Sequence, residues 1–133
     1  MHRSDDVSLA IALGANLPHA DAGPRQTLLA VRPLLSDVVH DWAGVPLRSS
    51  WSPLFDTTPV GGPPDQPRYW NAVVVVNGLI DTPSTAAALT LLGGLNRLES
   101  QFGRRRSLEQ RWGPRTLDLD LLFWGEHRMV HSR

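Results

Sequence analysis

Apolar residues along this chain follow two periods, one typical of strands and the other typical of helices. The strand pattern occurs in four segments, which are residues 7–14, 38–51, 69–77 and 116–124. We expect Gly44 and Pro46 to interrupt the second segment, because neither residue suits the interior of a strand. The last segment, TLDLDLLFW, alternates over its first six residues, which predicts a strand with one buried face and one polar face.

The helical pattern occurs twice. Pro24 suits the first turn of a helix, and an apolar face follows it at Leu28, Leu29, Val31, Leu34 and Leu35. Pro33 lies within this pattern, and we expect it to end or kink the helix. Thr82 or Ser84 should cap a second helix that runs to about residue 102. This order of strands and helices predicts an α+β sandwich with the helices packed on one sheet.

The composition is that of one globular domain, which we expect to span residues 1–133. Hydrophobic residues make up 41% of the chain, enough for one core, and no apolar run is long enough to cross a membrane. The absence of cysteine excludes a disulfide framework, a cysteine nucleophile and a thiolate metal site. We expect a cytoplasmic monomer that binds neither a membrane nor nucleic acid.

Charge is balanced overall but unevenly distributed along the chain. All 13 basic residues are arginine, which excludes a Schiff base and a phosphate-loop lysine. Residues 1–66 carry four Arg and seven Asp, whereas residues 97–115 carry six Arg and two Glu. A basic segment within a chain of zero net charge indicates a local anionic ligand.

Two aspartates stand in the last predicted strand. Asp118 and Asp120 are two residues apart, so both side chains should point to one face of the strand. The residues that should point the other way, into the core, are Leu117, Leu119 and Leu121. Adjacent carboxylates are hard oxygen ligands of the kind that Mg²⁺ shares with substrate phosphates. A D-x-D pair on a strand is equally often a solvated face, so the pair alone leaves both interpretations open.

The arginines that precede this strand favour the metal interpretation. Guanidinium groups bind phosphate oxygens in a bidentate fork, and arginine beside a metal suits phosphoryl transfer. Without the aspartates, the same run would be read as a solvated basic turn or a weak RNA-binding patch. The arginines concerned are Arg104, Arg105, Arg106, Arg111 and Arg115.

Residues Thr57–Pro67, TTPVGGPPDQP, form a proline- and glycine-rich loop that precedes another group of candidate residues. Tyr69 and Asn71 should share one face of the following strand, where an aromatic ring and an amide could recognise a flat heterocycle. Trp70 should point to the core, and the alternative for Asn71 is that it satisfies a turn. Glu99 could contact a nucleotide or the arginine segment, with a surface salt bridge as the alternative.

Four ordered motifs resemble one family. RWGPRTLDLDLL, the E-x-x-x-G-R-x-R pattern at 99–106, TTPVGGPPDQPRYWNA and the early ALGANL closely resemble the 6-hydroxymethyl-7,8-dihydropterin pyrophosphokinases of folate biosynthesis. The resemblance covers nearly the whole chain. It implies a ferredoxin-like α+β fold, and transfer of pyrophosphate from ATP to the hydroxymethyl group of the reduced pterin, with release of AMP.

The resemblance also implies roles for particular residues. Two Mg²⁺ ions would bind Asp118 and Asp120, and Arg104, Arg106 and Trp112 would belong to the loop that assists transfer. The positions that resemble ATP-binding residues are Asn96, Glu99, Arg115 and Arg133. The positions that resemble pterin-binding residues are Thr58, Pro59, Tyr69 and Asn71.

The sequence departs from the family at three places. Ala15 stands where family members usually have serine, and the arginine loop is one residue longer, which leaves Arg104, Arg105 and Arg106 as alternatives for the catalytic arginine. The family also continues past Arg133, with a Pro-His element, a further arginine and an aromatic residue that closes the pterin site. The chain is then either a fragment or a shortened protein with impaired activity, and the second case corresponds to a truncated homologue that binds nucleotide or pterin without turnover. The arginine content leaves a third hypothesis, an arginine-rich nucleic-acid-binding module.

Overall fold

The computed structural model describes residues 7–59, 62, 64–80, 83–104, 114–125 and 127–128. The elements are β1 (Val7–Ala15), α1 (Pro24–Ala43), β2 (Arg48–Trp51), β3 (Phe55–Thr57), β4 (Tyr69–Leu79), α2 (Thr85–Gln101), β5 (Asp118–Trp124) and β6 (His127–Arg128). Within the described residues these strands form one antiparallel sheet in the order β2-β4-β1-β5-β6, and β3 also pairs with β4.

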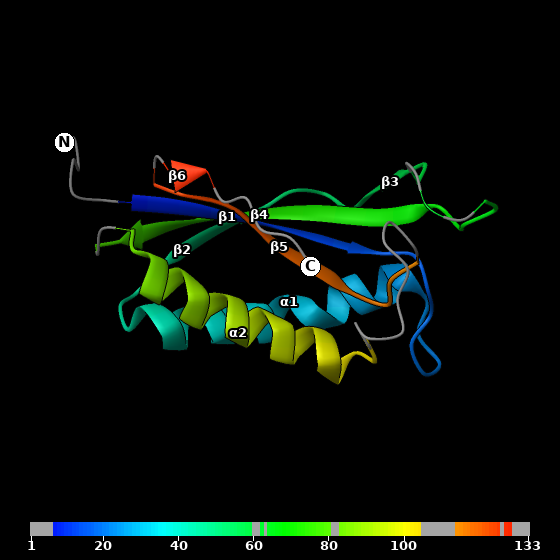
Figure 1. Ribbon diagram of the computed structural model, residues 1–133, viewed down its shortest axis with the longest axis horizontal. Coiled ribbons are helices and arrows are strands. Elements are labelled where there is room, and N and C mark those ends of the chain that lie inside the picture. The colour runs from blue at the N-terminus through cyan, green and yellow to red at the C-terminus, as the bar shows by residue number, and fades with distance from the viewer. Residues whose placement is uncertain are drawn as a thin grey trace.

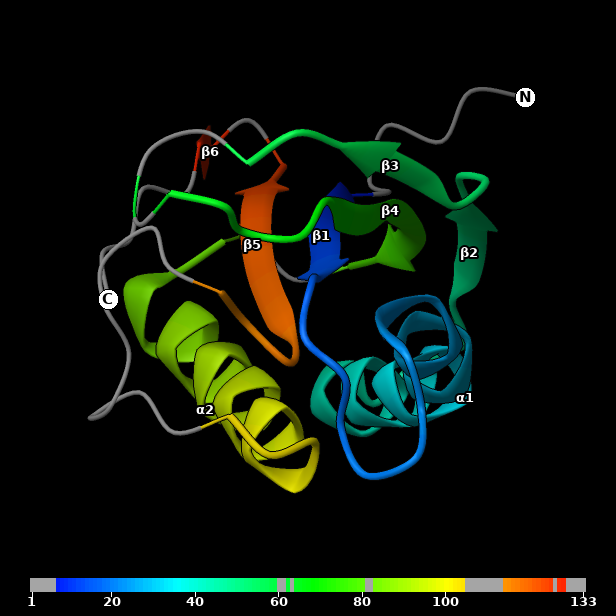
Figure 2. The ribbon, with the colours of Figure 1, turned by 90° about the vertical axis from the view of Figure 1, so that its right-hand side faces the viewer.

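The two helices lie on the same face of the sheet, and no helix of the described residues covers the other face (Figure 1). The molecule therefore has two layers, which are clear when it is viewed along the strands (Figure 2). This arrangement confirms the predicted α+β class and the ferredoxin-like sandwich of an antiparallel sheet with helices packed on it.

The core lies between the sheet and the helices. Each of the three central strands, β4, β1 and β5, contributes alternate residues to it, and each helix contributes one stripe. Its least exposed members are Leu9, Ile11, Ala15, Leu28, Val31, Leu91, Leu95 and Leu117. Burial of each such leucine or isoleucine contributes roughly 1.5–3 kcal/mol, so this layer provides most of the free energy that holds the sheet and helices together.

Helix α1 contradicts the prediction that it ends at Pro33 and the prediction of a strand at residues 38–43. Pro33 lies inside the helix and does not end it, and residues 38–43 are helical although a strand was expected there. The reason is the spacing of the buried residues, which continues at helical intervals through Leu28, Val31, Leu35 and Val39. Pro33 itself is exposed, so the helix accommodates it on the side away from the core. Only Arg48–Trp51 remains of the predicted second strand.

Replacing Pro33 with alanine should stabilise the protein. A proline inside a helix removes one backbone hydrogen bond and clashes with the preceding turn. We expect Pro33→Ala to raise the free energy of unfolding by about 1–2 kcal/mol in urea titrations. Pro24→Ala is the matched control, because Pro24 occupies the first turn, where proline is tolerated. An equal gain in both variants, or no gain for Pro33→Ala, would show that the helix carries no strain at residue 33.

The remaining elements agree with the sequence pattern except for two short strands, β3 and β6, which were not predicted. Ser84 caps α2, because its hydroxyl accepts a hydrogen bond of 3.2 Å from the backbone N–H of Ala87; the other candidate cap, Thr82, lies outside the described residues. Strand β3 was not predicted, and its three residues are all exposed, so no apolar pattern marks it. Among the described helices, none has the length and apolar character that a membrane span requires.

Candidate active site

The two aspartates lie on the open face of the sheet, away from the helices. In the register of the three central strands, Gly14 of β1 lies opposite Asn71 of β4 and Asp118 of β5. Directly opposed residues of antiparallel strands point to the same face, so Asn71 and Asp118 flank a position without a side chain. One step along, Asp120 lies opposite Ala12, which is also small. The predicted shared face of Asp118 and Asp120 is confirmed.

The leucines that alternate with these aspartates point into the core, as predicted. Leu117, Leu119 and Leu121 are each no more than 1% exposed, whereas both aspartates are partly exposed. The strand is therefore anchored by apolar burial on one face and presents its carboxylates on the other.

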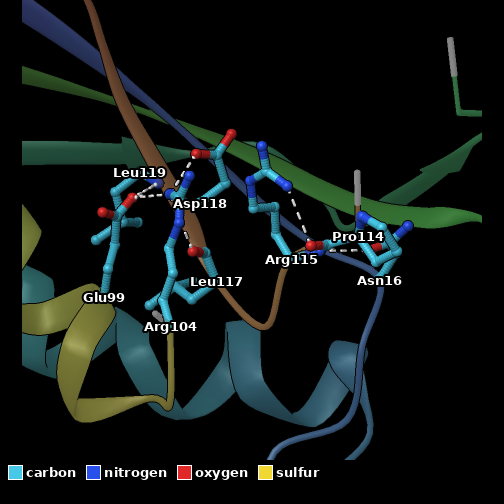
Figure 3. A network of polar contacts seen from close by, with 8 residues as sticks. All are labelled: Asn16, Glu99, Arg104, Pro114, Arg115, Leu117, Asp118 and Leu119. Carbon is cyan, nitrogen blue, oxygen red and sulfur yellow. Dashed lines mark hydrogen bonds and ion pairs between the residues drawn. The ribbon is translucent and has the colours of Figure 1, made fainter. Parts of the chain in front are cut away.

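Arg104 is a buried arginine that binds Asp118 (Figure 3). Its Nη1 atom donates hydrogen bonds to Asp118 Oδ1 at 2.8 Å and to Glu99 Oε2 at 2.7 Å. It also lies 3.4 Å from the carbonyl oxygen of Leu117. Arg104, the first of the three consecutive arginines, is thus attached to the strand that carries the aspartates.

Glu99 lies on the last turn of α2 and contacts the strand that carries the aspartates. Its side chain is 1% exposed, so the surface salt bridge considered from the sequence is wrong and the contact with the arginine segment is confirmed. Besides Arg104, Glu99 Oε2 accepts a hydrogen bond of 2.7 Å from the backbone N–H of Leu119. The carboxylate therefore joins α2 to β5 at the residue between the two aspartates (Figure 3).

Asn16, immediately after β1, joins two further segments. Its Oδ1 accepts a hydrogen bond of 2.8 Å from the backbone N–H of Arg115, and its Nδ2 donates to the carbonyl oxygen of Pro67 at 3.0 Å. The same Nδ2 lies 3.3 Å from Gln66 Oε1. Asn16 is 1% exposed and thus connects the end of the proline-rich loop to the start of β5.

Sequence analysis did not identify Asn16 as a site residue. It appears there only within ALGANL, and nothing in the spacing indicates contacts with residues 51 and 99 positions away. A polar residue directly after a continuous apolar strand was the available signal, because such a residue is often buried with partners where the chain leaves the sheet.

Replacing Asn16 with alanine should loosen both segments. The backbone N–H of Arg115 would lose its buried acceptor, which costs about 2 kcal/mol in unfolding free energy. Hydrogen exchange should also become faster at Arg115. Gln66→Ala is the control, since it removes the weaker of the side-chain contacts and leaves the Arg115 bond intact. Unchanged exchange at Arg115 in Asn16→Ala would show that this amide does not depend on Asn16.

The candidate pterin residues lie at the start of β4. Asn71 Nδ2 donates to Thr57 Oγ1 at 2.9 Å, and a Cβ atom on Gly14 would lie 3.5 Å from Asn71 Oδ1. The amide is thus oriented with its oxygen toward the middle strand. The ring of Tyr69 lies on the same side, 3.7 Å from that Cβ position, whereas Trp70 packs against the core. The predicted division between Tyr69 and Asn71 on one face and Trp70 on the other is confirmed.

Polar contacts also hold the β3–β4 hairpin beside these residues. Arg68 donates to Asp56 Oδ2 through Nε and to Thr58 Oγ1 through Nη1, both at 2.9 Å. The Arg68 guanidinium lowers the pKa of Asp56, through its hydrogen bond and its charge, so Asp56 stays ionised at neutral pH. Thr58 is therefore attached to the hairpin at the point where the proline-rich loop begins.

Comparison with known proteins assigns this arrangement to a family. The family described as 7,8-dihydro-6-hydroxymethylpterin-pyrophosphokinase (HPPK) matches residues 10–133. The chain belongs to the HPPK family. That match includes every candidate site residue of the chain.

Individual relatives agree with the family assignment. The chain is 48% identical over 75 residues to the 2-amino-4-hydroxy-6-hydroxymethyldihydropteridine pyrophosphokinase of Pseudomonas aeruginosa, covering 56% of this chain and 41% of that protein. It is 39% identical to the Haemophilus influenzae protein of the same name, covering 96% of this chain and 68% of the relative. For Bacillus subtilis the identity is 34%, covering 90% and 60%. The matched segments thus span between two fifths and about two thirds of these relatives.

The structure of this HPPK-family chain brings together some of the predicted site residues. Asp118, Arg104 and Glu99 form one network, and Asn16 joins the strand that follows Arg115 to the proline-rich loop. Asn96 is exposed on α2, about one turn before Glu99, and Pro59 is partly buried just after β3. The predicted residues that lie outside the described part of the chain are Arg105, Arg106, Arg111, Trp112 and Arg133.

Arg115 is buried at the entrance to β5 of the HPPK-family chain. Its Nη1 donates to the carbonyl oxygen of Pro114 at 3.1 Å, and its own carbonyl oxygen accepts from the backbone N–H groups of Asn16 and Leu17. Figure 3 shows its side chain on the same side of β5 as Asp118. The phosphate-binding role of Arg115 stays a prediction, for which a guanidinium is a suitable group.

The donor set of this HPPK-family site suits a hard divalent cation. Asp118 and Asp120 offer carboxylate oxygens from one face of a strand whose other face is fixed in the core. Within the described residues, no group of three or more His, Asp or Glu side chains is arranged to hold a metal by itself. A Mg²⁺ ion with two protein carboxylates completes its octahedron with water and substrate phosphate oxygens.

Proposed function

We propose that this chain transfers pyrophosphate from ATP to the hydroxymethyl group of 6-hydroxymethyl-7,8-dihydropterin and releases AMP, in folate synthesis. The observation that carries the proposal is the placement of Asp118 and Asp120 on the open face of the sheet, opposite Gly14 and Ala12, in a chain of the HPPK family. The names of the relatives support the pterin substrate and the pyrophosphokinase reaction.

In the proposed reaction the pterin hydroxyl oxygen bonds to the β-phosphorus of ATP, and the proton of that hydroxyl passes to water. The bond from that phosphorus to the oxygen shared with the α-phosphate breaks, so AMP leaves. Mg²⁺, held by Asp118 and Asp120, would supply neutralisation of phosphate charge. The chain contributes position and charge: the Asn71 amide oxygen faces the middle strand, where a ring N–H could donate to it, and Tyr69 offers a face for stacking.

The arginines would act on the phosphates. Arg115 lies on the same side of β5 as Asp118 (Figure 3) and would offer its guanidinium to phosphate oxygens. Arg104 is already bound to Asp118 and Glu99, which favours a role in holding the site over direct transfer. Arg105 and Arg106, which both lie outside the described residues, then stand as the candidates for assisting transfer.

The test is AMP release from ATP by the 133-residue chain, with Mg²⁺ and with or without the reduced pterin. AMP that requires both the pterin and Mg²⁺ would support the transferase. Folded protein that binds Mg-ATP and releases no AMP would support the non-catalytic homologue instead. Binding of RNA with strong salt dependence, and none of ATP, would support the arginine-rich nucleic-acid module.

A further inference from the structure

Glu99 and Arg104 form a buried ion pair directly behind the proposed metal site. Both side chains are 1% exposed, whereas the side chain of Asp118 is 19% exposed. A single guanidinium nitrogen, Nη1 of Arg104, donates to one oxygen of each carboxylate, at 2.7 Å and 2.8 Å. The Arg104 guanidinium is therefore shared between the buried carboxylate of Glu99 and the carboxylate of Asp118, which faces the open side of the sheet.

The shared position sets how much of the arginine charge acts on Asp118. A buried guanidinium is stabilised by acidic partners on both sides, and removing one partner concentrates its attraction on the other. Arg104 close to Asp118 alone would neutralise that carboxylate and oppose a divalent cation. With Glu99 in place, Asp118 keeps net negative charge on the face where the divalent cation would bind.

Glu99 also fixes the backbone between the two aspartates. Its Oε2 accepts a hydrogen bond of 2.7 Å from the N–H of Leu119, the residue that separates Asp118 from Asp120. The spacing of the two carboxylates thus depends on a contact from α2 as well as on the strand itself. Partners that orient metal ligands in this way commonly change metal affinity 10–100-fold when they are mutated.

We propose that Glu99 is a positioning residue for the two-aspartate site: it draws the charge of Arg104 away from Asp118 and holds the strand between the aspartates, and thereby sets the affinity for a divalent cation. This inference rests on the proposed function, because it assumes that Asp118 and Asp120 bind the cation. It differs from the nucleotide-binding role that the resemblance implied for Glu99, since the carboxylate faces Arg104 and Leu119.

The experiment measures Mn²⁺ binding to the whole chain by electron paramagnetic resonance of the free ion. Glu99→Gln keeps the shape of the side chain but removes its charge, and we expect Mn²⁺ affinity to fall about tenfold. The double variant E99Q/R104Q removes both charges, and we expect it to restore the affinity to within about threefold of the unmodified chain, because the charge of Arg104 then no longer competes for Asp118. Asp41→Asn, an exposed carboxylate on α1, is the control and should leave the affinity unchanged.

Each result decides a different point. Unchanged Mn²⁺ affinity in folded Glu99→Gln overturns the inference, because a purely structural Glu99 would lower the melting temperature without changing metal affinity. If Glu99→Gln does not fold, the double variant decides: a tenfold loss of affinity there overturns the inference, and affinity near that of the unmodified chain supports it. If Asp118→Asn and Asp120→Asn bind Mn²⁺ as the unmodified chain does, the proposed metal site fails and the inference fails with it.

Discussion

Replacing Asp118 or Asp120 with asparagine should lower the rate of pterin-dependent AMP formation by about a thousandfold. A divalent cation contributes several kcal/mol of charge stabilisation during phosphoryl transfer, and each 1.36 kcal/mol of barrier corresponds to a tenfold change in rate. Asparagine keeps the volume of the side chain and removes the anionic oxygen that the metal needs. The measurement is AMP release at saturating ATP and pterin over a range of Mg²⁺ concentrations.

The fold should survive both substitutions. Asp118 and Asp120 lie on the polar face of β5, and the leucines that anchor the strand point the other way. Arg104 keeps its ion pair with Glu99 in either variant, so no buried guanidinium is left without an acidic partner. Asp37→Asn, an exposed substitution on α1, serves as the control for loss of a carboxylate. Full activity in either site variant, at any Mg²⁺ concentration, would contradict the metal assignment.

The strands that carry this site were predictable because their patterns are local. Residues 7–15 and 69–79 are nearly continuous apolar segments in the centre of the sheet, and residues 118–121 alternate between core and open face. The predicted end of α1 at Pro33 was wrong because the helix-breaking tendency of proline was given more weight than the helical spacing of Leu35 and Val39, which are buried in the core. Strand β3 has exposed residues and is defined by pairing with β4, which no short-range pattern records.

The features of the site were also predictable only where they depend on local sequence. The shared face of Asp118 and Asp120 follows from the period of a strand, so the sequence predicted it. The contact of Glu99 with Leu119 spans 20 positions and the contact of Asn16 with Arg115 spans 99. Such contacts depend on how α2 and the segment after β1 pack against the start of β5. Their geometry depends on the tertiary structure, so the sequence alone indicated which residues could take part and not which contacts they make.

Substitution of Gly14 should have the other large effect on activity, because Gly14 lies between the proposed pterin contact and the proposed metal ligand. A glycine inside a strand often marks a place where a ligand or another chain approaches the backbone closely. Gly14 lies opposite Asn71 and Asp118 in the register, which carry the candidate pterin contact and the candidate metal ligand. A Cβ atom there would be in ordinary contact with Asn71 Oδ1, at 3.5 Å, and with the Tyr69 ring, at 3.7 Å.

Gly14→Val should therefore raise KM for the pterin by roughly 10–100-fold while the protein remains folded. The branched methyl groups would crowd the Asn71 amide and the Tyr69 ring, and overpacking of this kind costs about 1–3 kcal/mol, with 1.4 kcal/mol for each tenfold change in binding. Valine suits a strand, so the sheet should form. Gly14→Ala is the matched control, because a single methyl fits at ordinary contact distances, and its KM should change less than about threefold. If the valine variant turned over with the KM of the unmodified chain, the pterin would have to bind away from Gly14, and Asn71 would lose its proposed role along with it.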